Sequence, residues 1–339
     1  MPVTIIDIAR RVGKSITTVS RALHDYDDVS PETKQLVRRV AAEMGYTPST
    51  LAQRLQKQRS DTLGLILPTF GPRFSDPFFS EFLAGVGNVA AEIGYDLLVS
   101  TRAPGEAEMT AYRKNVQSRR VDGFIVVRTR RQDPRIEYLS DSDFPFIAFG
   151  RTGGDLDFPF VDEDSFYGMG LVVEHLVSLG HRRIACISAP ADLMFAEHRL
   201  KGLRAGLSTH DMSIPAEMIR EGDLTQRGGY QQASGLLEHP QPPTAIVACN
   251  DLMALGAVSL AQERGMVVGR DISITGFDDI PMAEHAHPPL TTLRQPIYQI
   301  GRLICEMLVQ ILQGETLERR QVLLQPELVV RSSTGRAPS

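Results

Sequence analysis

Residues 4–23 read TIIDIARRVGKSITTVSRAL, and this stretch decides how the rest of the chain is interpreted. Thr4 can cap a first helix whose apolar side chains recur at helical spacing, and Asp7 lies where a capping box needs its acidic partner. Gly13 can end that helix, because glycine tolerates the left-handed backbone of a tight stop. Ser15 can cap a second helix only two residues later. The stretch therefore predicts two short helices joined by a glycine-containing turn.

A third helix is expected within VSPETKQLVRRVAAEMGY, residues 29–46. Ser30 and Pro31 supply a cap followed by proline at the first helical position, and Gly45 ends the pattern. The apolar stripe that can close a small core over the first two helices is Leu36, Val37, Val40, Ala41 and Met44. In a helix-turn-helix unit the second helix enters the major groove of DNA, so this part of the sequence predicts a DNA-binding domain.

The first turns of the second helix carry the side chains expected to reach base edges. Arg21 can make bidentate hydrogen bonds to guanine, while Thr17 and Ser20 are short, weaker readers of base or phosphate. Ile16 can pack on a thymine methyl group, but it can equally belong to the core. Candidates for phosphate contact, with capping or a plain surface role as the alternative, are Thr4, His24 and Lys34.

Charge is unevenly distributed along this chain of 339 residues, whose net charge is −5. The first 60 residues carry ten Lys or Arg against six Asp or Glu, so the remainder is strongly acidic. A basic head on an acidic body is expected when only the head meets phosphate, although a solvated helical surface would have the same charge. The helix-turn-helix pattern favours double-stranded DNA as the partner.

Residues 3–23 and 29–55 resemble the headpiece and hinge of the lactose-repressor/galactose-repressor (LacI/GalR) family of bacterial transcription regulators, and the resemblance continues to about residue 331. In that family, base-reading residues occupy the positions of Ile16, Thr17 and Arg21. The resemblance also implies a hinge helix that orders on operator DNA, pairs with its dimer mate and wedges Leu55 into the minor groove. A plain linker is the alternative. The predicted DNA-contacting residues are Thr4, Ser15, Ile16, Thr17, Ser20, Arg21, His24, Ser49, Ala52 and Leu55.

From residue 62 onward, short β-rich runs alternate with amphipathic helical stretches, which is typical of parallel α/β sheets with right-handed crossovers. The expected strands are 63–67, 96–100, 123–127, 146–149, 184–188, 245–248 and 272–276. The expected helices include 78–93, 169–179, 253–264 and 297–312. Two short runs at 322–324 and 328–330 are expected to return and complete the sheets. The units suffice for two sheets, divided near residues 160–164.

The expected fold is therefore α/β: a helix-turn-helix headpiece followed by two lobes, each a doubly wound parallel sheet. The resemblance implies a periplasmic-binding-protein type 1 fold for the lobes, with a cleft between them. The predicted domains are a DNA-binding headpiece at 1–47, a hinge helix and linker at 48–60, and an effector-binding and dimerisation domain at 61–339. In that domain one lobe takes about 61–160 and 294–321, and the other about 161–293 and 322–331.

Ligands of parallel α/β sheets bind beyond the carboxyl ends of the strands, so the residues after each strand are candidates for a ligand site. Planar donors and acceptors together with aromatic faces suit a sugar, whose ring has hydroxyls at its edge and C–H groups on its faces. The resemblance carries the family's effector contacts to Arg199, Asn250 and Asp278. In loops that vary within the family it extends them to Phe78, Phe79, Arg128, Arg151 and Leu224. Salt bridges that brace the cleft are the alternative role for the charged residues.

The chain lacks the sequence devices of common enzyme classes. It has no G-x-G-x-x-G after a strand, no G-x-x-x-x-G-K-[ST] and no G-x-S-x-G, so no cofactor and no catalytic residue is predicted. His285 and His287 have no third ligand close in sequence, so no metal is predicted. Cys186, Cys249 and Cys305 are far apart and odd in number, which favours reduced core thiols in a cytoplasm. No secretion signal and no apolar run of the ~18 residues that a membrane span needs is evident.

The sequence is interpreted as a cytoplasmic, homodimeric transcription regulator, because one recognition helix reads few bases and two-fold symmetry doubles the site into a palindrome. Most members of the resembled family are repressors released by a sugar, which implies control of carbohydrate uptake or catabolism genes. The blocks FPFIAFGR (144–151) and FPFVDEDS (158–165) look most like members that sense α-glucosides such as maltose, sucrose or trehalose. Alternatives are a corepressor-dependent regulator with a non-sugar ligand, a soluble sugar-binding protein without DNA function, and a small-molecule enzyme.

Overall fold

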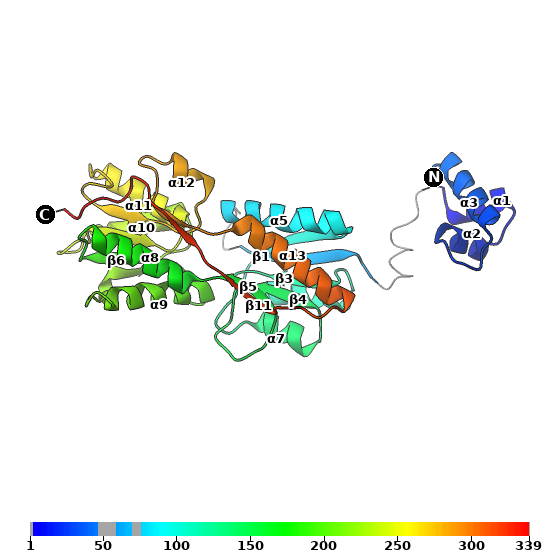
Figure 1. The fold of residues 1–339 in the computed structure, drawn as a ribbon, viewed down its shortest axis with the longest axis horizontal. Helices are drawn as coiled ribbons and strands as arrows, with labels where there is room; N and C mark the ends of the chain where they lie inside the picture. Colours follow the sequence, from blue (N-terminus) through cyan, green and yellow to red (C-terminus); the bar gives the residue numbers. More distant parts are fainter. Residues whose placement is uncertain (1–2, 47–58, 70–75, 339) are drawn as a thin grey trace. The chain divides into compact units, whose positions relative to one another are not determined.

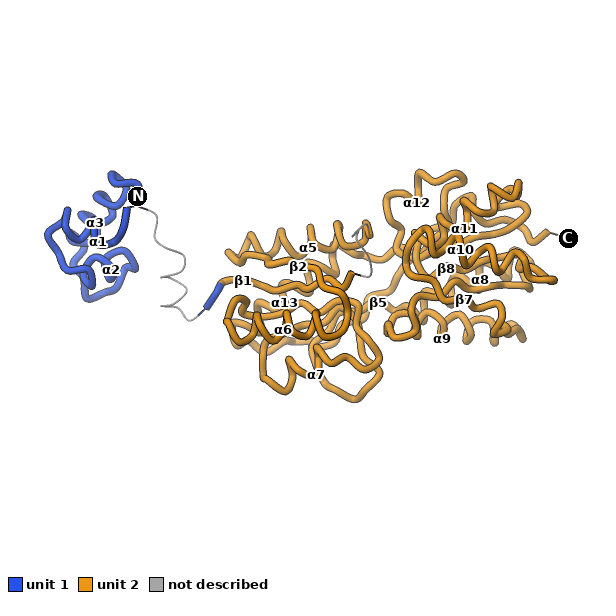
Figure 2. Tube along the Cα trace, turned by 180° about the vertical axis from the view of Figure 1, so that it is seen from behind, with its two compact units in different colours: residues 1–60 blue, residues 61–339 orange. Residues whose placement is uncertain are grey.

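The computed structural model describes residues 3–46, 59–69 and 76–338. By its internal contacts the chain divides into two compact units, residues 1–60 and 61–339, which Figure 2 colours separately. Three of the residues predicted to contact DNA, Ser49, Ala52 and Leu55, lie outside the described residues. Their roles stay predictions.

The first unit contains the three helices that the sequence predicts: α1 (Ile5–Val12), α2 (Ile16–Leu23) and α3 (Pro31–Glu43). The carboxylate of Asp7 accepts hydrogen bonds from the backbone N–H and the hydroxyl of Thr4, at 2.9 and 2.7 Å. Gly13 and Gly45 follow α1 and α3 with φ angles of 66° and 65°, the left-handed backbone that ends a helix. Both stops are therefore confirmed.

A small apolar core joins these helices. Ile8 from α1, Val19 and Ala22 from α2 and Val37 from α3 are fully buried in it. Because an isolated helix of eight residues is marginal in water, this shared core stabilises the unit more than helix propensity does.

One lobe of the second unit is built on a six-stranded parallel sheet with the order β11-β5-β4-β3-β1-β2 (Figure 1). Its strands are β1 (Thr62–Pro68), β2 (Asp96–Arg102), β3 (Gly123–Val126), β4 (Phe146–Phe149), β5 (Phe160–Glu163) and β11 (Gln321–Leu324). Its helices are α5 (Pro77–Ile93), α6 (Glu106–Gln117), α7 (Pro134–Asp141) and α13 (Ile297–Gln313). Apolar residues of α5 and α13 bury one face of the sheet, and those of α6 and α7 bury the other.

The other lobe has a four-stranded parallel sheet with the order β7-β6-β8-β9. Its strands are β6 (Ile184–Ser188), β7 (Ile219–Glu221), β8 (Ala245–Ala248) and β9 (Ser273–Thr275). Its helices are α8 (Ser165–Ser178), α9 (Met194–Ser208), α10 (Gln226–Leu237), α11 (Asp251–Glu263), α12 (Pro281–His285) and the 3₁₀ helix η1 (Ala216–Met218). Helix α8 packs on α9, and α10 packs on α11. A separate antiparallel pair, β10 (Thr292–Arg294) and β12 (Glu327–Val329), lies beside β9 through short bridges from β10 and the residue before it.

The predicted division between the lobes is wrong at two points. Strand β5 pairs with β4 and β11 pairs with β5, both in parallel, so residues 160–163 and 321–324 belong to the first lobe. The strand pairing assigns these residues to the first lobe, and packing agrees with it: Val161 is fully buried in the apolar core that the first lobe forms with α13. The chain crosses between the lobes after β5, between β10 and α13, and between β11 and β12 (Figure 1).

The C-terminal tail packs on the second lobe as an added edge beside β9. Ile274 N–H donates to the carbonyl of Ser333 at 2.9 Å, and Ala337 N–H donates to that of Leu179 at 2.9 Å. Ser333 is fully buried. Although the tail is polar in composition, its backbone groups complete the edge of the sheet.

Two further features concern the interior and membranes. Cys186, Cys249 and Cys305 are buried and unpaired, as predicted for core thiols. Among the helices in the described ranges, none combines the length and the apolar character of a bilayer span.

Candidate functional site

A cavity lies where the carboxyl ends of strands from both sheets meet, as expected for a ligand site in parallel α/β sheets. All eight residues predicted to bind an effector line it. The lining residues from the first lobe are Asp76, Phe78, Phe79, Arg128, Thr129, Phe149, Gly150, Arg151, Asp162 and Glu163. Those from the second lobe and the crossing segment are Phe195, Arg199, Leu224, Asn250, Asp278 and Gln295. The structure thus brings the predicted set together, and ligand binding by it stays a prediction.

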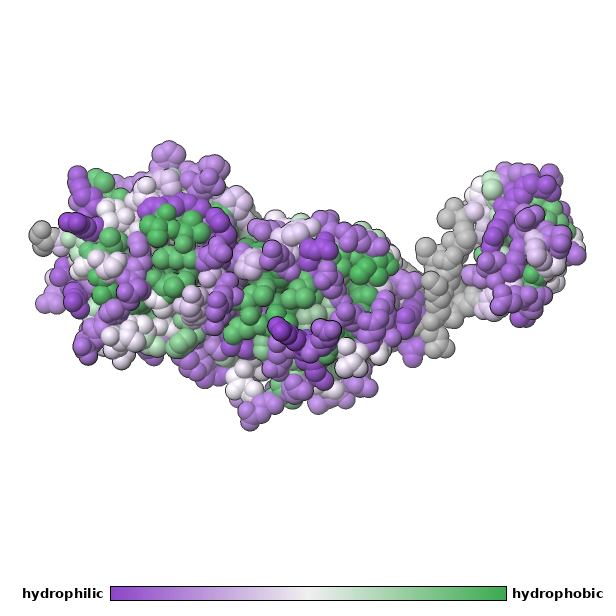
Figure 3. Space-filling model, viewed as in Figure 1, coloured by the Kyte–Doolittle hydropathy of each residue, from purple (hydrophilic) through white to green (hydrophobic). Residues whose placement is uncertain are grey.

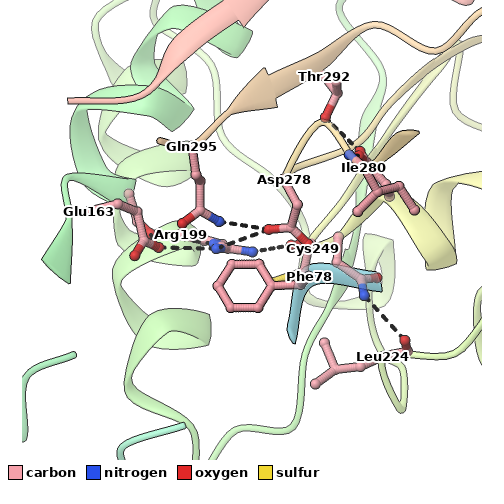
Figure 4. Close-up of polar contacts among 12 residues, drawn as sticks. Phe78, Glu163, Arg199, Leu224, Cys249, Asp278, Ile280, Thr292 and Gln295 are labelled. Atoms are coloured by element: carbon pink, nitrogen blue, oxygen red, sulfur yellow. Dashed lines mark hydrogen bonds and ion pairs between the residues drawn. The ribbon is translucent and has the colours of Figure 1, made fainter. Parts of the chain in front are cut away.

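Arg199 is the polar centre of this cavity (Figure 4). It lies on α9, is only 5% exposed, and its guanidinium forms an ion pair of 3.0 Å with Glu163 of β5. Asp278 lies 3.8 Å from the same guanidinium, and the carbonyl of Cys249 accepts from it. Burial would lower the pKa of Arg199, but these acidic neighbours raise it, so the side chain is a permanent cation. The guanidinium also stacks 3.5 Å from the ring centre of Phe277.

Two amide side chains complete the polar set around Asp278. Gln295 donates to a carboxylate oxygen of Asp278 at 2.7 Å, and the amide oxygen of Gln295 is buried with no hydrogen-bond partner in the described residues. Asn250 caps α11 by accepting from Met253 N–H, and donates to the carbonyl of Leu224. Burial raises the pKa of Asp278 above its ordinary value, against the attraction of Arg199.

The first lobe contributes two further ion pairs. Arg128 and Asp76 are joined at 2.7 Å, and so are Arg151 and Asp162. Asp162 also accepts from the backbone N–H of Glu163 at 2.9 Å. Burial and the adjacent Glu163 raise the pKa of Asp162, which Arg151 opposes. Each guanidinium in the lining therefore has a carboxylate beside it.

Aromatic rings form another part of the cavity wall. The rings of Phe78 and Phe149 are nearly parallel, with an interplanar angle of 4° and centres 5.7 Å apart. Phe79 lies under the guanidinium of Arg128, and Phe195 lies under that of Arg199. Such faces suit the C–H groups of a sugar ring, while the adjacent charged pairs suit its hydroxyls.

The loop that carries Arg128 is anchored by a buried cluster of charges. Arg135 bonds to Asp133 at 2.6 Å and to Glu108 at 2.9 Å, and Glu108 also bonds to Arg130 at 2.8 Å. Burial opposes ionisation of Asp133, but the hydrogen bonds from Arg135 hold the pKa of that carboxyl low. The same loop reaches the second lobe, since the carbonyl of Thr129 accepts from Met194 N–H at 2.9 Å.

Several lining residues were missed by sequence reasoning. Asp162, Glu163 and Gln295 lie on segments where the chain crosses between the lobes, and the strand that ends at Glu163 was expected to be a boundary. The rule that ligands sit beyond strand ends would have found Asp162 and Glu163 had FPFVDE been read as a strand. Gln295 has no such local signal.

In the headpiece, α2 presents an exposed outer face. Ile16 is 49% exposed, so the alternative that it belongs to the core is wrong: Val19 and Ala22 occupy the buried face instead. Thr17 is exposed beside it, and Ser20 is half-buried. Surface position is what contact with a base requires.

The side chains of the other described residues predicted to contact DNA bond to nearby residues of the headpiece. Arg21 pairs with Asp28 at 2.7 Å, and Ser15 caps α2 by accepting from Thr18 N–H at 3.1 Å. His24 bonds through Nδ1 to the carbonyl of Ser20 at 2.7 Å. Thr4, which bonds to Asp7, has a capping role as well. These bonds orient the side chains, and contact with DNA stays a prediction.

Comparison with known proteins agrees with this architecture. The model for bacterial regulatory proteins of the lacI family matches residues 4–49, and that for a periplasmic binding protein-like domain matches residues 173–334. The HTH-type transcriptional regulator AglR of Rhizobium meliloti (strain 1021) is 36% identical over 342 residues, covering 100% of this chain and 96% of AglR.

Two solved structures extend the likeness to the fold. The transcriptional regulator CelR–cellobiose complex is 31% identical, with a TM-score of 0.76 and coverage of 98% of this chain and 99% of that one. The lac repressor dimer bound to operator and the anti-inducer ONPF is 32% identical, with a TM-score of 0.86 and coverage of 99% and 100%. The chain therefore belongs to the lacI family of bacterial regulatory proteins. It is a DNA-binding transcriptional regulator, and its relatives are regulators rather than enzymes.

Proposed function

We propose that this regulator is a cytoplasmic repressor of carbohydrate uptake or catabolism genes. It binds a palindromic operator as a homodimer and is released when a small sugar, best an α-glucoside, occupies the cavity between the lobes. The observation that carries the proposal is the cavity lining, in which ion pairs offering adjacent donors and acceptors surround parallel phenylalanine rings. The cellobiose held by the related regulator CelR supports a sugar as the ligand class.

Operator recognition rests on α2. Its outer face presents Ile16 and Thr17 to solvent, and Arg21 can exchange its exposed pair with Asp28 for guanine or phosphate. One such helix reads few bases, so two copies are needed for specificity. Apolar patches on both lobes of residues 61–339 are visible in Figure 3, and contiguous exposed apolar surface of this kind supports pairing of two chains.

Release follows from differential binding. The sugar contacts Arg199 and Asp278 from one lobe and the residues after β3 and β4 from the other, so it favours one arrangement of the lobes. A ligand shifts an equilibrium only by its difference in affinity for the two states. In the dimer the favoured arrangement changes the separation of the two headpieces and lowers the affinity for the operator.

A gel-shift experiment tests the proposal. The full-length protein is incubated with fragments of its own genome, and bound fragments are challenged with maltose, sucrose, trehalose and cellobiose. We expect a selected fragment to be retained by protein alone and released by at least one of these sugars. Retention that increases with a ligand would indicate a corepressor instead, and release only by purines or amino acids would contradict the sugar.

Substitutions in the cavity and on α2 test separately the binding of the sugar and the binding of DNA. Asp278→Asn removes a predicted ligand acceptor in the cavity and should leave DNA retention intact while abolishing release. Thr17→Ala on α2 should weaken retention without changing sugar binding, measured by thermal shift, because a bound ligand raises the melting temperature. Loss of both properties in both variants would contradict the separation of roles.

A further inference from the structure

The cavity lining has more acidic than basic side chains, and every basic one is paired. Among its described residues, four carboxylates (Asp76, Asp162, Glu163 and Asp278) face three guanidiniums (Arg128, Arg151 and Arg199). The pairs are short: Arg128 to Asp76 and Arg151 to Asp162 are both 2.7 Å, and Arg199 to Glu163 is 3.0 Å. Nearby His198 adds no positive charge at neutral pH, because burial lowers its pKa to about 4.

An ion pair of this kind suits a hydroxyl group. A hydroxyl is both donor and acceptor, so it can donate to the carboxylate and accept from the guanidinium without breaking the pair. The buried amide oxygen of Gln295, which has no partner among the described residues, offers one further acceptor. The lining thus matches a neutral ligand with many hydroxyls.

A phosphate group, unlike a hydroxyl, cannot bond to both members of such an ion pair. It brings a charge of about −1.5 to −2 and only accepts hydrogen bonds when ionised, so it needs cations that are not already neutralised. Entering this lining, it would have to take Arg128, Arg151 or Arg199 from a carboxylate and leave that carboxylate buried and unpaired. Removing one partner of a buried pair is costly, because the remaining charge is uncompensated.

We propose that the cavity selects unphosphorylated, uncharged sugars and rejects their phosphate esters and acidic derivatives. This inference rests on the proposed sugar-responsive function and adds the charge state of the ligand. It also implies that the regulator senses a sugar before any kinase or phosphotransfer reaction has modified it. Asp162 and Asp76 are then specificity-determining residues, since each neutralises an arginine that would otherwise attract an anion.

The first test compares matched pairs of ligands on the full-length protein. Titration calorimetry and thermal shift are run with trehalose against trehalose 6-phosphate, sucrose against sucrose 6-phosphate, and glucose against glucose 6-phosphate. We expect the neutral member of the effector pair to bind at least about 100-fold more tightly than its phosphate ester. Tighter binding of the ester would overturn the inference and leave the sugar-responsive function standing. Absence of binding by every sugar would overturn both.

The second test reverses the selectivity. Asp162→Asn is nearly isosteric and leaves Arg151, which is 27% exposed in its side chain, without its carboxylate. We expect the preference for the neutral sugar over its phosphate ester to fall about tenfold in this variant, and in Asp76→Asn at the other pair.

The matched control is Asp157→Asn. Asp157 is 70% exposed and pairs with Arg320 at 3.5 Å outside the cavity, so the same loss of charge occurs away from the ligand. Its selectivity should equal that of the unmodified protein. An equal fall in selectivity in Asp157→Asn and Asp162→Asn would show that net charge, and not the pair at Arg151, sets the preference, and would overturn the assignment of Asp162.

Discussion

Three residues of the cavity hold a left-handed backbone although none is glycine. Arg128, Leu224 and Asp278 have φ angles of 51°, 67° and 117°. Such conformations cost roughly 1–3 kcal/mol each and persist only where the surroundings fix them. The carbonyl of Arg128 accepts from the buried guanidinium of Arg135 at 3.0 Å, and that of Leu224 accepts from Asn250 at 3.1 Å. The backbone N–H of Asp278 donates to the carbonyl of Leu293 at 2.8 Å. The strain therefore lies where the polar side chains must be aimed before a ligand arrives.

The partly buried ring of His198 makes the stability of the protein depend on pH. Burial and the nearby Arg151 lower its pKa from 6.5 to about 4, so the unfolded chain binds more protons than the folded chain between these values. The contribution of His198 to stability is therefore complete above pH 6.5 and is lost as the pH falls toward 4. We expect His198→Gln to flatten the decline in unfolding free energy over this window, by at most about 1.4 kcal/mol per pH unit. Urea unfolding at several pH values measures it.

His285→Gln is the control for this prediction, since His285 is exposed at the end of α12. Its unfolding free energy should follow that of the unmodified protein through the same window. Nuclear magnetic resonance gives a direct check, because the ring of His198 should titrate near pH 4. Titration of that ring near 6.5 would contradict the prediction.

Arg21 and Asp28 give a prediction for DNA binding. Their pair is about half exposed, so it stabilises the headpiece little, while Asp28 competes with DNA for the guanidinium. We expect Asp28→Asn to raise affinity for a selected genomic fragment about two- to fivefold, measured by fluorescence anisotropy. The control is Asp27→Asn, which removes one negative charge at the adjacent residue and leaves the ion pair of Arg21 with Asp28 in place. An equal gain in both variants would attribute the effect to general charge.

The residues of the cavity could be predicted where a strand end marks them. Arg128, Asn250 and Asp278 follow strands that the apolar pattern reveals, and the family resemblance supplied Arg199. Gln295 could not be found this way, because a crossing segment has no periodicity that says which side chain points inward. The orientation of Ile16 was also undecided, since an isoleucine on a short helix fits a core and a surface equally well.

Helices α5 and α13 pack so closely that glycines are needed at their contact. A Cβ atom on Gly85 would lie 2.3 Å from the carbonyl oxygen of Tyr298, and one on Gly301 would lie 2.5 Å from that of Phe82. Both contacts are with backbone, so they are relieved only by moving a helix. We expect Gly85→Ala to lower the unfolding free energy by about 2 kcal/mol or more, measured by chemical denaturation.

Gly87 provides the matched control two residues along the same helix. A Cβ atom there meets nothing within 4 Å. Alanine should therefore act only through helix propensity and stabilise the protein by up to about 1 kcal/mol. Opposite signs for the two substitutions are expected. Destabilisation by Gly87→Ala of the same size would mean that backbone flexibility, and not the helix contact, matters at Gly85.

The apolar pattern of the sequence predicted most helices and strands, but it did not predict which strands pair with one another. Alternation of strands and helices located β1, β3, β4, β6 and β8, because their apolar runs are buried on both faces. The assignment of β5 and β11 to a lobe failed, since a four-residue strand contains no information about which sheet edge is open. The contacts of the C-terminal tail could not be predicted either, because they are made by backbone groups, which composition does not describe.

At the scale of the whole molecule, the cavity joins two lobes that share several connections. The loop after β3 is anchored in the first lobe by Glu108, Asp133 and Arg135, and it bonds to the second lobe through Thr129 and Arg131. The pair of Glu163 and Arg199 also spans the lobes. In the proposed function, a ligand that binds one lobe arrangement more tightly than the other shifts the balance toward it, and that shift would couple the cavity to DNA binding.

Coupling between a sugar site and a DNA site is reciprocal by thermodynamic necessity. If a sugar lowers the affinity for a specific DNA fragment by some factor, saturating that fragment must lower the affinity for the sugar by the same factor, expected to be about 5- to 150-fold. Calorimetric titration of the sugar with and without the fragment, beside anisotropy titrations of the fragment with and without the sugar, compares the two factors. A fragment of unrelated sequence at the same concentration is the control and should change sugar affinity less. Unequal factors would show that the sugar acts outside this equilibrium, and factors that raise both affinities would identify a corepressor.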